Sequence, residues 1–557
     1  MEDVTRRGFI GFGATALAGA ALAGMAGCAP GSAGSGKENQ AADGANASGA
    51  DMFYATRASG ADRFGIAPVK ASELGEPDDS CDWLVIGGGN TGLFAAAHGL
   101  DVGMKTILLE KNPMTGGAGV GTEVSQAFSD AKIMKENNAV SGTFPEIYHY
   151  FMMQNAWLSD AMLVSNYITH NHLVHDWLYD HGMGTVFAAV GGVEGPVGGI
   201  MYEGMGTGVN TKLAEEFEKG GGTAYLSTGA TKLVVDDDGN VVGVLADSKD
   251  KKDRYFSAKN VFIGTGGFGT NPDMVEFYIG QAGTIASKRD EQMGIPHNGD
   301  GIRMMLGVGA VESQDMWATA PAQGAPVQDM WDTEVDRACR EANLWVNERG
   351  QRVGNEKWNA ISSNFGVAYR QMTGSYWNVF DASAVARMET EDFLMGSRWV
   401  IPKETDGKPM PNMGEALDAA AESGTIFKAD TLEGLAQAAG IEPEQLVETV
   451  DHYNEMCRAG VDTDLWKDSV ALNELGEAPY YAIEVVPAWF STLNGVKVDA
   501  DLHVLDSEGH PIKGLYAGGA DASEFFKTIY SHGFGGSCSA FSYFCGYYAA
   551  EVAKKTL

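Results

Sequence analysis

Cysteine is scarce in this chain, and it is never spaced for cofactor attachment. Six cysteines occur in 557 residues, and none shows C-x-x-C, C-x-x-C-H or iron–sulfur spacing. Cys538 and Cys545 stand seven residues apart on an expected helix, which is too far for a disulfide. The sequence therefore predicts scattered, buried thiols.

Positive charge is also in short supply. The chain has 39 lysines and arginines against 74 aspartates and glutamates, and its formal net charge is −35 at pH 7. Nucleic-acid binding needs clustered cations that neutralise phosphates, and adhesion to anionic lipid needs a basic patch. The composition therefore argues against nucleic acid as a partner and against that mode of membrane binding.

Histidine is infrequent, but four of the 11 histidines lie close together: His170, His172, His175 and His181. On a helix, only His172 and His175 have the spacing that makes side chains neighbours. No carboxylate completes a set of metal ligands at a suitable distance along the chain. We therefore expect helix-surface or pocket-lining histidines and no metal site.

Glycine, by contrast, is abundant, at 74 residues, well above the ~7% average of proteins. The first glycine motif, G-x-G-x-x-G, follows the apolar run Trp83–Ile86. Gly87 permits a tight turn, Gly89 lets a pyrophosphate approach the backbone, and Gly92 allows close packing of helix on strand. The next helix presents its N–H groups and positive dipole end to phosphates. Glu110, which ends the second predicted strand, is placed to accept from a ribose hydroxyl.

Five more glycine motifs are spread over the rest of the chain. Each lies where an apolar strand or an expected helix begins or ends, as a nucleotide-contacting turn requires. With the first motif they predict a single bound FAD molecule. They are Thr115–Gly117, Gly264–Gly269, Gly299–Gly301, Gly514–Asp521 and Gly535–Ser537.

Residues 1–28 are predicted to be an export signal that is not part of the fold. Thr5–Ile10 resembles a twin-arginine signal, and a Gly/Ala-rich apolar stretch follows as far as Gly27. That stretch is poorly apolar for a stable membrane span. Met25–Cys28 resembles a bacterial lipobox with Cys28 as the lipid acceptor, and simple cleavage near this point is the alternative. Twin-arginine export carries folded cofactor proteins, which agrees with the glycine motifs.

The remaining sequence predicts an α/β fold, in which an inserted α+β capping domain interrupts a Rossmann-like FAD-binding domain. Strand–glycine–helix patterns occur on both sides of a region with short strands, several tryptophans and two capped helical runs. The predicted divisions are a flexible linker at 29–77, the first part of the FAD-binding domain at 78–307, the capping domain at 308–491 and the second part of the FAD-binding domain at 492–557.

Local patterns add four further expectations. Residues 144–183 are predicted to be helical, with Trp157 and Met162 among their apolar positions. A hairpin turn is predicted at Asp236–Asn240. A buried strand is predicted before Gly264, and a helix from the last glycine motif to about Lys554.

The order of these motifs resembles the flavoprotein family of fumarate reductases and succinate dehydrogenases, including its soluble exported members. The resemblance spans residues 81–551 and also includes Val346–Arg352 and Leu432–Asp462. It implies a substrate site between the two domains, over the isoalloxazine ring, and non-covalent FAD. By this resemblance the FAD contacts are Gly87, Gly89, Asn90, Thr91, Gly92, Glu110, Lys111, Thr115, Gly116, Gly117, Thr265, Gly266, Gly267, Asp300, Ala520, Asp521, Gly536 and Ser537.

The resemblance fails at the substrate clamp. Fumarate reductases of this family hold the substrate carboxylates with two histidines and an arginine. Phe490 and Ser491 stand in place of a histidine pair, Gly533 replaces the arginine, and Trp317–Pro321 lacks a histidine of the cap. Charged hydrogen bonds are worth ~1.5–3 kcal/mol each, so their loss argues against fumarate. Nearby aromatic residues favour a larger, flatter, less charged molecule: Trp489, Phe490, Phe525, Phe526, Tyr530 and Phe534.

Two catalytic residues are predicted, Arg352 and Tyr530. Arg352 matches the arginine that in this family gives the substrate carbon its proton, and a surface arginine is the alternative. An arginine has a pKa above ~12, so it needs a partner that returns the proton. Tyr530 and His532 are candidates for substrate contact. The related ketosteroid dehydrogenases suggest that Tyr530 donates to a substrate carbonyl. The alternative for both residues is loop packing. The candidate partners of Arg352 are Glu334, Arg337, Arg340 and Glu341.

Together these features predict an exported FAD-dependent reductase that saturates an activated C=C bond, with substrate contacts at Ser491, His532 and Gly533. A ketosteroid-type dehydrogenase and a lipid-anchored flavoprotein that only relays electrons are the alternatives. The expected partners are a small-molecule acceptor, a separate quinol-linked, cytochrome or flavin donor, and the outer face of the cell membrane through a lipid.

Overall fold

The computed structural model describes residues 59–190, 196–280, 297–322, 333–358, 361–395, 407–527, 530 and 535–557. These residues belong to one compact unit, Ser59–Leu557. The predicted export signal, most of the predicted linker, His532 and Gly533 lie outside the described residues.

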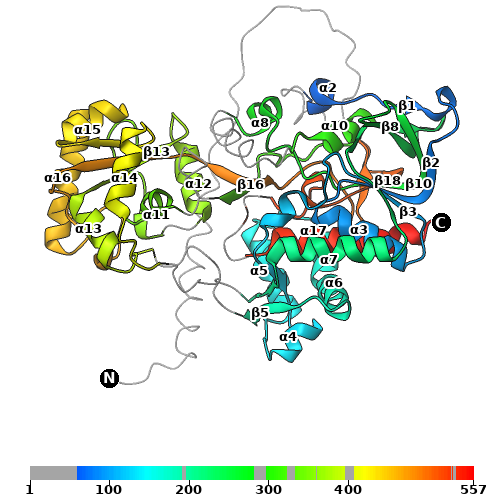
Figure 1. Ribbon diagram of the computed structural model, residues 1–557, viewed down its shortest axis with the longest axis horizontal. Helices are drawn as coiled ribbons and strands as arrows, with labels where there is room; N and C mark the ends of the chain where they lie inside the picture. The colour runs from blue at the N-terminus through cyan, green and yellow to red at the C-terminus, as the bar shows by residue number, and fades with distance from the viewer. Residues whose placement is uncertain are drawn as a thin grey trace, which may run out of the picture. The chain divides into compact units, whose positions relative to one another are not determined.

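The glycine motifs lie on a sheet that has nine strands within the described residues (Figure 1). Its strands are β1 (Val69–Lys70), β2 (Asp79–Ile86), β3 (Thr106–Leu109), β7 (Thr223–Tyr225), β8 (Thr228–Val235), β9 (Val241–Ser248), β10 (Arg254–Ile263), β17 (His503–Leu505) and β18 (Pro511–Ala517). The order is β1-β8-β9-β10-β2-β3-β7, with β18 beside β10 and β17 beside β18. The pairs β18–β10, β10–β2, β2–β3 and β3–β7 are parallel. This is the Rossmann-like arrangement that the sequence predicts.

Three helices pack side by side next to this sheet: α3 (Asn90–Asp101), α7 (Met205–Lys219) and α17 (Ser537–Lys554) (Figure 1). Helix α3 contacts both of the others. An added Cβ on Gly546 of α17 would lie 2.2 Å from the carbonyl oxygen of Thr91 in α3, so only glycine allows this approach. The last helix thereby fixes the position of the first nucleotide-binding turn.

The prediction of one helical segment at 144–183 is wrong in detail. Two helices occur, α5 (Phe144–Gln154) and α6 (Ala161–Asp180), and Trp157 between them has a φ of 60°. Trp157 and Met162 are exposed. The break has a tertiary cause, because the Ser159 hydroxyl donates to the Phe525 carbonyl and the Asp160 carboxylate caps α6. Apolar periodicity does not reveal such a distant contact.

The other local predictions are confirmed. The turn between β8 and β9 closes with a hydrogen bond from the Asp236 amide to the Asn240 carbonyl at 2.9 Å. Strand β10 runs into Gly264, and α17 ends at Lys554.

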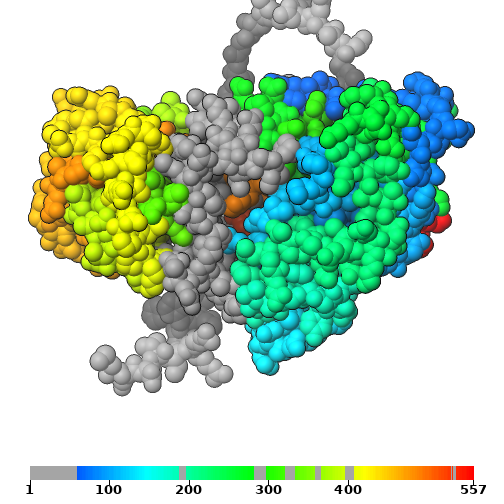
Figure 2. Space-filling model, viewed as in Figure 1, coloured from blue at the N-terminus to red at the C-terminus, as the bar shows by residue number. Residues whose placement is uncertain are grey.

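A second, antiparallel sheet has the order β12-β13-β15-β14. Its strands are β12 (Leu344–Val346), β13 (Tyr376–Asp381), β14 (Phe427–Ala429) and β15 (Tyr480–Val485). Its neighbouring helices are α11 (Glu334–Arg340), α13 (Ala382–Thr390), α14 (Met413–Glu422), α15 (Leu432–Ala439) and α16 (Pro443–Ala459). The side chain of Trp345 packs with α11, α13 and α14, whereas those of Leu344 and Val346 pack with α15 and α16. Figure 2 shows the yellow helices of this group as one continuous surface.

This second sheet and its helices form the predicted α+β insertion within the α/β fold. The exact residues at which the capping domain begins and ends remain a prediction. Two strands that flank the insertion, β11 (Thr319–Ala322) and β16 (Ala488–Thr492), pair with each other in antiparallel fashion.

A small antiparallel sheet completes the part that positions the site. It has the order β4-β6-β5 and comprises β4 (Ser125–Ala127), β5 (Thr185–Val190) and β6 (Gly198–Tyr202). The other α-helices in the described ranges are α2 (Gly60–Phe64), α4 (Lys132–Glu136), α8 (Pro272–Tyr278), α10 (Asp300–Gly307) and α12 (Ile361–Arg370). None of the described helices is both long enough and apolar enough to cross a membrane.

Candidate functional site

The predicted FAD motifs meet at one edge of the nine-stranded sheet. Strands β18, β10, β2 and β3 are parallel neighbours, and their carboxyl ends lead into Gly518–Asp521, Gly264–Gly267, Gly87–Gly89 and Glu110. Ligands of open parallel sheets bind outside the carboxyl ends of the strands. The sheet therefore collects residues that lie more than 400 positions apart in the chain.

The first turn is closed to side chains at Gly87 and Gly92 and open at Gly89. Gly87 has a φ of 100°, and an added Cβ there would lie 2.3 Å from the Gly264 carbonyl oxygen. A Cβ on Gly92 would lie 1.8 Å from the Gly87 oxygen. Above Gly89, in contrast, the nearest atom would be the Gly116 oxygen at 3.7 Å. Gly89 caps α3, so the free N–H groups of that helix point toward this open position.

Glu110 supports the same turn. One carboxylate oxygen accepts from the Gly88 amide and the other from the Asn112 amide, each at 2.7 Å. A carboxylate has about four acceptor positions, so it can also accept from a ribose hydroxyl. The Gly116 amide donates to the Gly88 carbonyl at 2.7 Å, which joins the Thr115–Gly117 motif to this turn.

Asp521 joins two further motifs. Its carboxylate accepts from the Thr265 hydroxyl at 2.9 Å and from the Gly266 amide at 2.8 Å. The side chain is fully buried, and burial raises its pKa despite these hydrogen bonds. Ala520 lies against Gly267. The β10 and β18 turns are thus held as one unit.

The remaining predicted FAD contacts have partners within the same region. Lys111 forms an ion pair with Asp300 at 2.8 Å, where α10 begins. Asn90 accepts from Asn210 at 2.9 Å. Thr91 is buried against Gly519, the residue before Ala520.

The beginning of α17 meets β4. Gly536 has a φ of 81°, its carbonyl accepts from the Gln126 amide at 3.0 Å, and Ser537 follows as the first helical residue. Ser125 Oγ and Gln126 Nε2 are buried atoms with no hydrogen-bond partner. Buried polar atoms normally have partners, so both fit a ligand with polar edges, such as a flavin ring. The sequence did not indicate Ser125 or Gln126.

Two predicted substrate or catalytic residues that the structure describes, Ser491 and Tyr530, lie beside the glycine turns that are predicted to contact FAD (here called the flavin turns). The Ser491 hydroxyl donates to the Thr492 carbonyl at 2.7 Å and to the Gly266 carbonyl at 3.4 Å. The Tyr530 amide donates to the Thr319 carbonyl at 3.4 Å, and burial raises the pKa of the Tyr530 hydroxyl to about 12. The sequence did not indicate Thr319 as a site residue. In the structure its buried hydroxyl has no hydrogen-bond partner.

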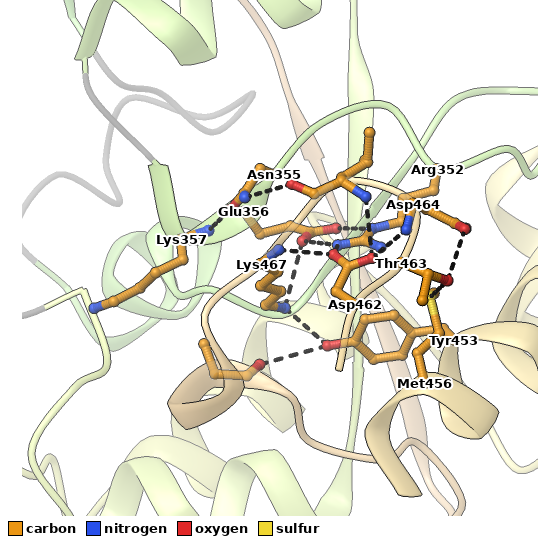
Figure 3. Close-up of polar contacts among 12 residues, drawn as sticks. Arg352, Asn355, Glu356, Lys357, Tyr453, Met456, Asp462, Thr463, Asp464 and Lys467 are labelled. Atoms are coloured by element: carbon orange, nitrogen blue, oxygen red, sulfur yellow. Dashed lines mark hydrogen bonds and ion pairs between the residues drawn. The ribbon is translucent and has the colours of Figure 1, made fainter. Parts of the chain in front are cut away.

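Arg352 lies in a buried cluster of four charged side chains (Figure 3). Its Nε and Nη2 donate to Glu356 at 2.9 and 2.8 Å, and Nη2 also donates to Asp462 at 2.8 Å. Lys467 Nζ lies 3.4 Å from Glu356 and donates to the Tyr453 hydroxyl at 2.8 Å. The cluster is electrically neutral, with two cations and two anions. The alternative of a surface arginine is therefore wrong.

The electrostatics of this cluster keep Arg352 charged. Burial alone would lower the pKa of Arg352, but the hydrogen bonds and charges of Glu356 and Asp462 raise it above its ordinary value. Burial would raise the pKa of Asp462, yet the hydrogen bonds from Arg352 and two backbone amides lower it. Burial lowers the pKa of Lys467. Arg352 Nη1 is buried and has no hydrogen-bond partner, so it is the nitrogen available to a ligand.

The residues that hydrogen-bond to Arg352 are not among the four candidates suggested from the sequence, two glutamates and two arginines. Two of the suggested residues form other ion pairs: Arg340 with Asp336 at 2.7 Å, and Glu341 with Arg387 at 3.2 Å. The true partners are Glu356, four residues away, and Asp462, 110 residues away. Glu356 is close to Arg352 in the sequence, but residues 352–355 are not helical, so helical spacing does not indicate this pair.

The histidines of α6 serve the packing of that helix. His175 is fully buried between the Tyr202 hydroxyl and the Gln126 carbonyl, and burial lowers its pKa to about 4. His172 lies 3.0 Å from Asp130. In the part of the chain that the structure describes, no group of three or more histidine, cysteine, aspartate or glutamate side chains is placed to hold a metal ion.

Tight glycine turns at the carboxyl edge of a Rossmann-like sheet, one of them open beside a helix N-terminus, define a dinucleotide-binding protein. The chain belongs to the FAD binding domain family, whose model matches residues 82–537. FAD is therefore its cofactor, as predicted, and the protein is an FAD-dependent oxidoreductase.

Known relatives agree with this assignment. The chain is 28% identical over 489 residues to the vinyl phenol reductase of Lactiplantibacillus plantarum, covering 84% of this chain and 95% of the relative. It is 25% identical over 461 residues to a cytochrome-type fumarate reductase of Shewanella frigidimarina, covering 81% and 73%. The fold is similar to that of the 3-ketosteroid Δ1-dehydrogenase from Sterolibacterium denitrificans, with a TM-score of 0.70 at 18% identity and coverage of 86% and 100%. The predicted resemblance to fumarate reductase-like flavoproteins is confirmed.

The close approach at Gly92 leads to a first prediction. Gly92→Ala should weaken FAD binding by about 10- to 100-fold, because the added methyl group pushes α3 away from the Gly87 turn. The measurement is FAD titration of the apoprotein followed by flavin absorbance. Gly75→Ala is the matched control, since an added Cβ there meets nothing within 4 Å. Equal FAD affinity in both variants would contradict the assignment of this turn.

Proposed function

We propose that this oxidoreductase reduces an activated C=C bond of an organic acceptor that is larger and less charged than fumarate. The observation that carries the proposal is the substrate side of the flavin turns. There the Ser491 hydroxyl contacts Gly266, and Phe490 is exposed beside it, where a dicarboxylate clamp needs histidines. The similarity to a vinyl phenol reductase supports an aromatic acceptor.

When FAD is bound, its ring would supply a hydride to one carbon of the double bond. The other carbon must receive a proton, and Arg352 is the proposed donor through Nη1. Its Nε and Nη2 are held by carboxylates, so the guanidinium cannot turn away. Because those carboxylates raise the pKa of Arg352, the proton leaves only if another returns in the same event. That proton must come from solvent, and Glu356, which accepts hydrogen bonds from Nε and Nη2, is the proposed relay that passes it to the guanidinium.

A second candidate, a ketosteroid-type dehydrogenase, runs the reaction in the opposite direction. Tyr530 favours it, because a tyrosine beside the flavin turns can donate to a substrate carbonyl. With its pKa raised to about 12, the hydroxyl stays protonated and remains a donor at neutral pH. Anaerobic assay with a reduced viologen donor, against oxidation with an artificial acceptor, distinguishes the two directions.

The choice of acceptor is the main test of this proposal. An aromatic or polycyclic enoate or enone should be reduced at least about 100-fold more efficiently than fumarate, because two or more charged hydrogen bonds to carboxylates are missing. The measurement is kcat/KM with reduced viologen for fumarate, cinnamates, imidazole acrylates and enone steroids. Fumarate as the best substrate of the panel would overturn the proposal. Failure with every acceptor would favour the electron-relay alternative.

The role of Arg352 is tested on the acceptor so identified. Arg352→Ala should lower kcat by ~100- to 10,000-fold, the usual loss when a general acid is removed. Arg352→Lys should recover little, because an ammonium cannot replace the planar guanidinium held by two carboxylates. Arg349→Ala in the same turn is the control, since its side chain is exposed. Bound FAD and its visible spectrum should be unchanged throughout. If Arg352→Ala keeps kcat within a few-fold, Tyr530 becomes the donor to test.

We further propose that the protein works outside the cytoplasm, attached by lipid to the outer face of the cell membrane and supplied with electrons by a separate quinol-linked, cytochrome or flavin donor. Support comes from the sequence at Thr5–Ile10 and Cys28. The chain matches a single FAD domain model, and the sequence shows no haem attachment motif. A separate donor follows from this composition.

This location is tested by fractionation of the natural host or a twin-arginine-competent host. Cys28→Ala should release the protein from the membrane fraction, and Arg6→Lys combined with Arg7→Lys should keep it in the cytoplasm. The double variant keeps both positive charges, so it isolates the twin-arginine requirement. Membrane attachment that survives Cys28→Ala would contradict the lipid anchor.

A further inference from the structure

Gln126 is held on three of its four polar atoms and is free on the fourth. Its amide donates to Gly536, and its carbonyl accepts from Asn171 at 3.1 Å and from His175 at 2.8 Å. Its side-chain oxygen accepts from the Tyr167 hydroxyl at 2.7 Å. The residue has 0% of its surface exposed, and Nε2 has no partner. Three backbone hydrogen bonds and one side-chain hydrogen bond thus fix this residue, whose side-chain nitrogen is an unused donor.

Such an arrangement is costly unless a ligand completes it. A buried donor without an acceptor destabilises a fold by about 1–3 kcal/mol. The backbone contacts hold β4 in place, and the bond from Tyr167 fixes the plane of the amide. The side chain therefore cannot turn toward solvent to find an acceptor.

The position of Gln126 identifies the ligand. An added Cβ on Gly536 would lie 2.7 Å from the Gln126 amide nitrogen, so β4 is as close as it can be to the start of α17. Tyr167, which holds the Gln126 side chain, packs on the first part of α17, with its ring centroid 6.2 Å from that of Phe541. The amide of Gln126 consequently lies among residues at the predicted flavin turn.

We propose that Gln126 Nε2 donates a hydrogen bond to the pyrimidine edge of the FAD ring and thereby raises its reduction potential. Reduction increases the negative charge on that edge, and a donor binds a charged acceptor more strongly than a neutral one. Helix α17 acts in the same sense, because its 18 residues direct the positive end of their dipole at Gly536. Gln126 is thus a determinant of flavin potential contributed by a different segment of the chain.

The proposal rests on FAD as the cofactor and is independent of the acceptor. The experiment measures the reduction potential of FAD bound to the full chain, without substrate, by titration against a reference dye. Gln126→Leu removes the donor and keeps the volume. It should lower the equilibrium constant for reduction by about tenfold, a shift of about 30 mV for two electrons.

Two further variants make the result specific. Gln126→Glu keeps the shape and the acceptor for Tyr167 but replaces the donor with an anion, so it should lower the constant by more than Gln126→Leu does. Tyr167→Phe removes the bond that orients the amide but keeps the donor, so it should lower the constant in the same direction as Gln126→Leu and by less.

A folded, FAD-containing Gln126→Leu protein with an unchanged potential would overturn the proposal. The same conclusion holds if Gln126→Glu leaves the potential unchanged. A change in KM alone, with the potential constant, would also overturn it, because the amide would then face the substrate. A failure of the proposed acceptor chemistry leaves all these potentials measurable and is recognised separately.

Discussion

The close packing of α3 on the end of β2 is the constraint on which the nucleotide site depends. Only hydrogen atoms separate Gly92 from the Gly87 carbonyl and Gly546 from Thr91. Because no side chain intervenes, the positive end of α3 reaches the turn where a pyrophosphate must bind. The contacts made by Glu110 and Asp521 then bring the neighbouring turns against this fixed point. The site is assembled mainly from backbone, which is why glycine dominates its sequence.

That origin explains what could be predicted. Glycine turns, strand ends and the acid at Glu110 are local in sequence, and their spacing carried both the fold class and the cofactor. The hairpin at Asp236–Asn240 and the last helix were predictable for the same reason. The assignments of individual FAD and substrate contacts remain predictions, since they concern atoms that the glycine pattern does not describe.

The parts that could not be predicted depend on distant contacts. Asp462 meets Arg352 across 110 residues, and nothing in the local sequence of either residue indicates the other. The break near Trp157 is fixed by Phe525, and the unused donor of Gln126 is defined by neighbours from α6 and α17. In each case, tertiary packing overrides local propensity or creates a polar environment that no motif encodes.

The neutral cluster around Arg352 has a consequence for how the capping region can change during evolution. Replacing any one of its four charged members leaves an unbalanced charge in a dry interior, which typically costs 3–5 kcal/mol. Apolar replacement of a whole buried cluster is often neutral or stabilising, but it would remove the guanidinium. On the proposed role of Arg352, a more stable descendant is therefore reached by losing the chemistry. Selection for turnover would then preserve Glu356, Asp462 and Lys467 as a group, so these positions should vary together or not at all among relatives that use the same proton donor.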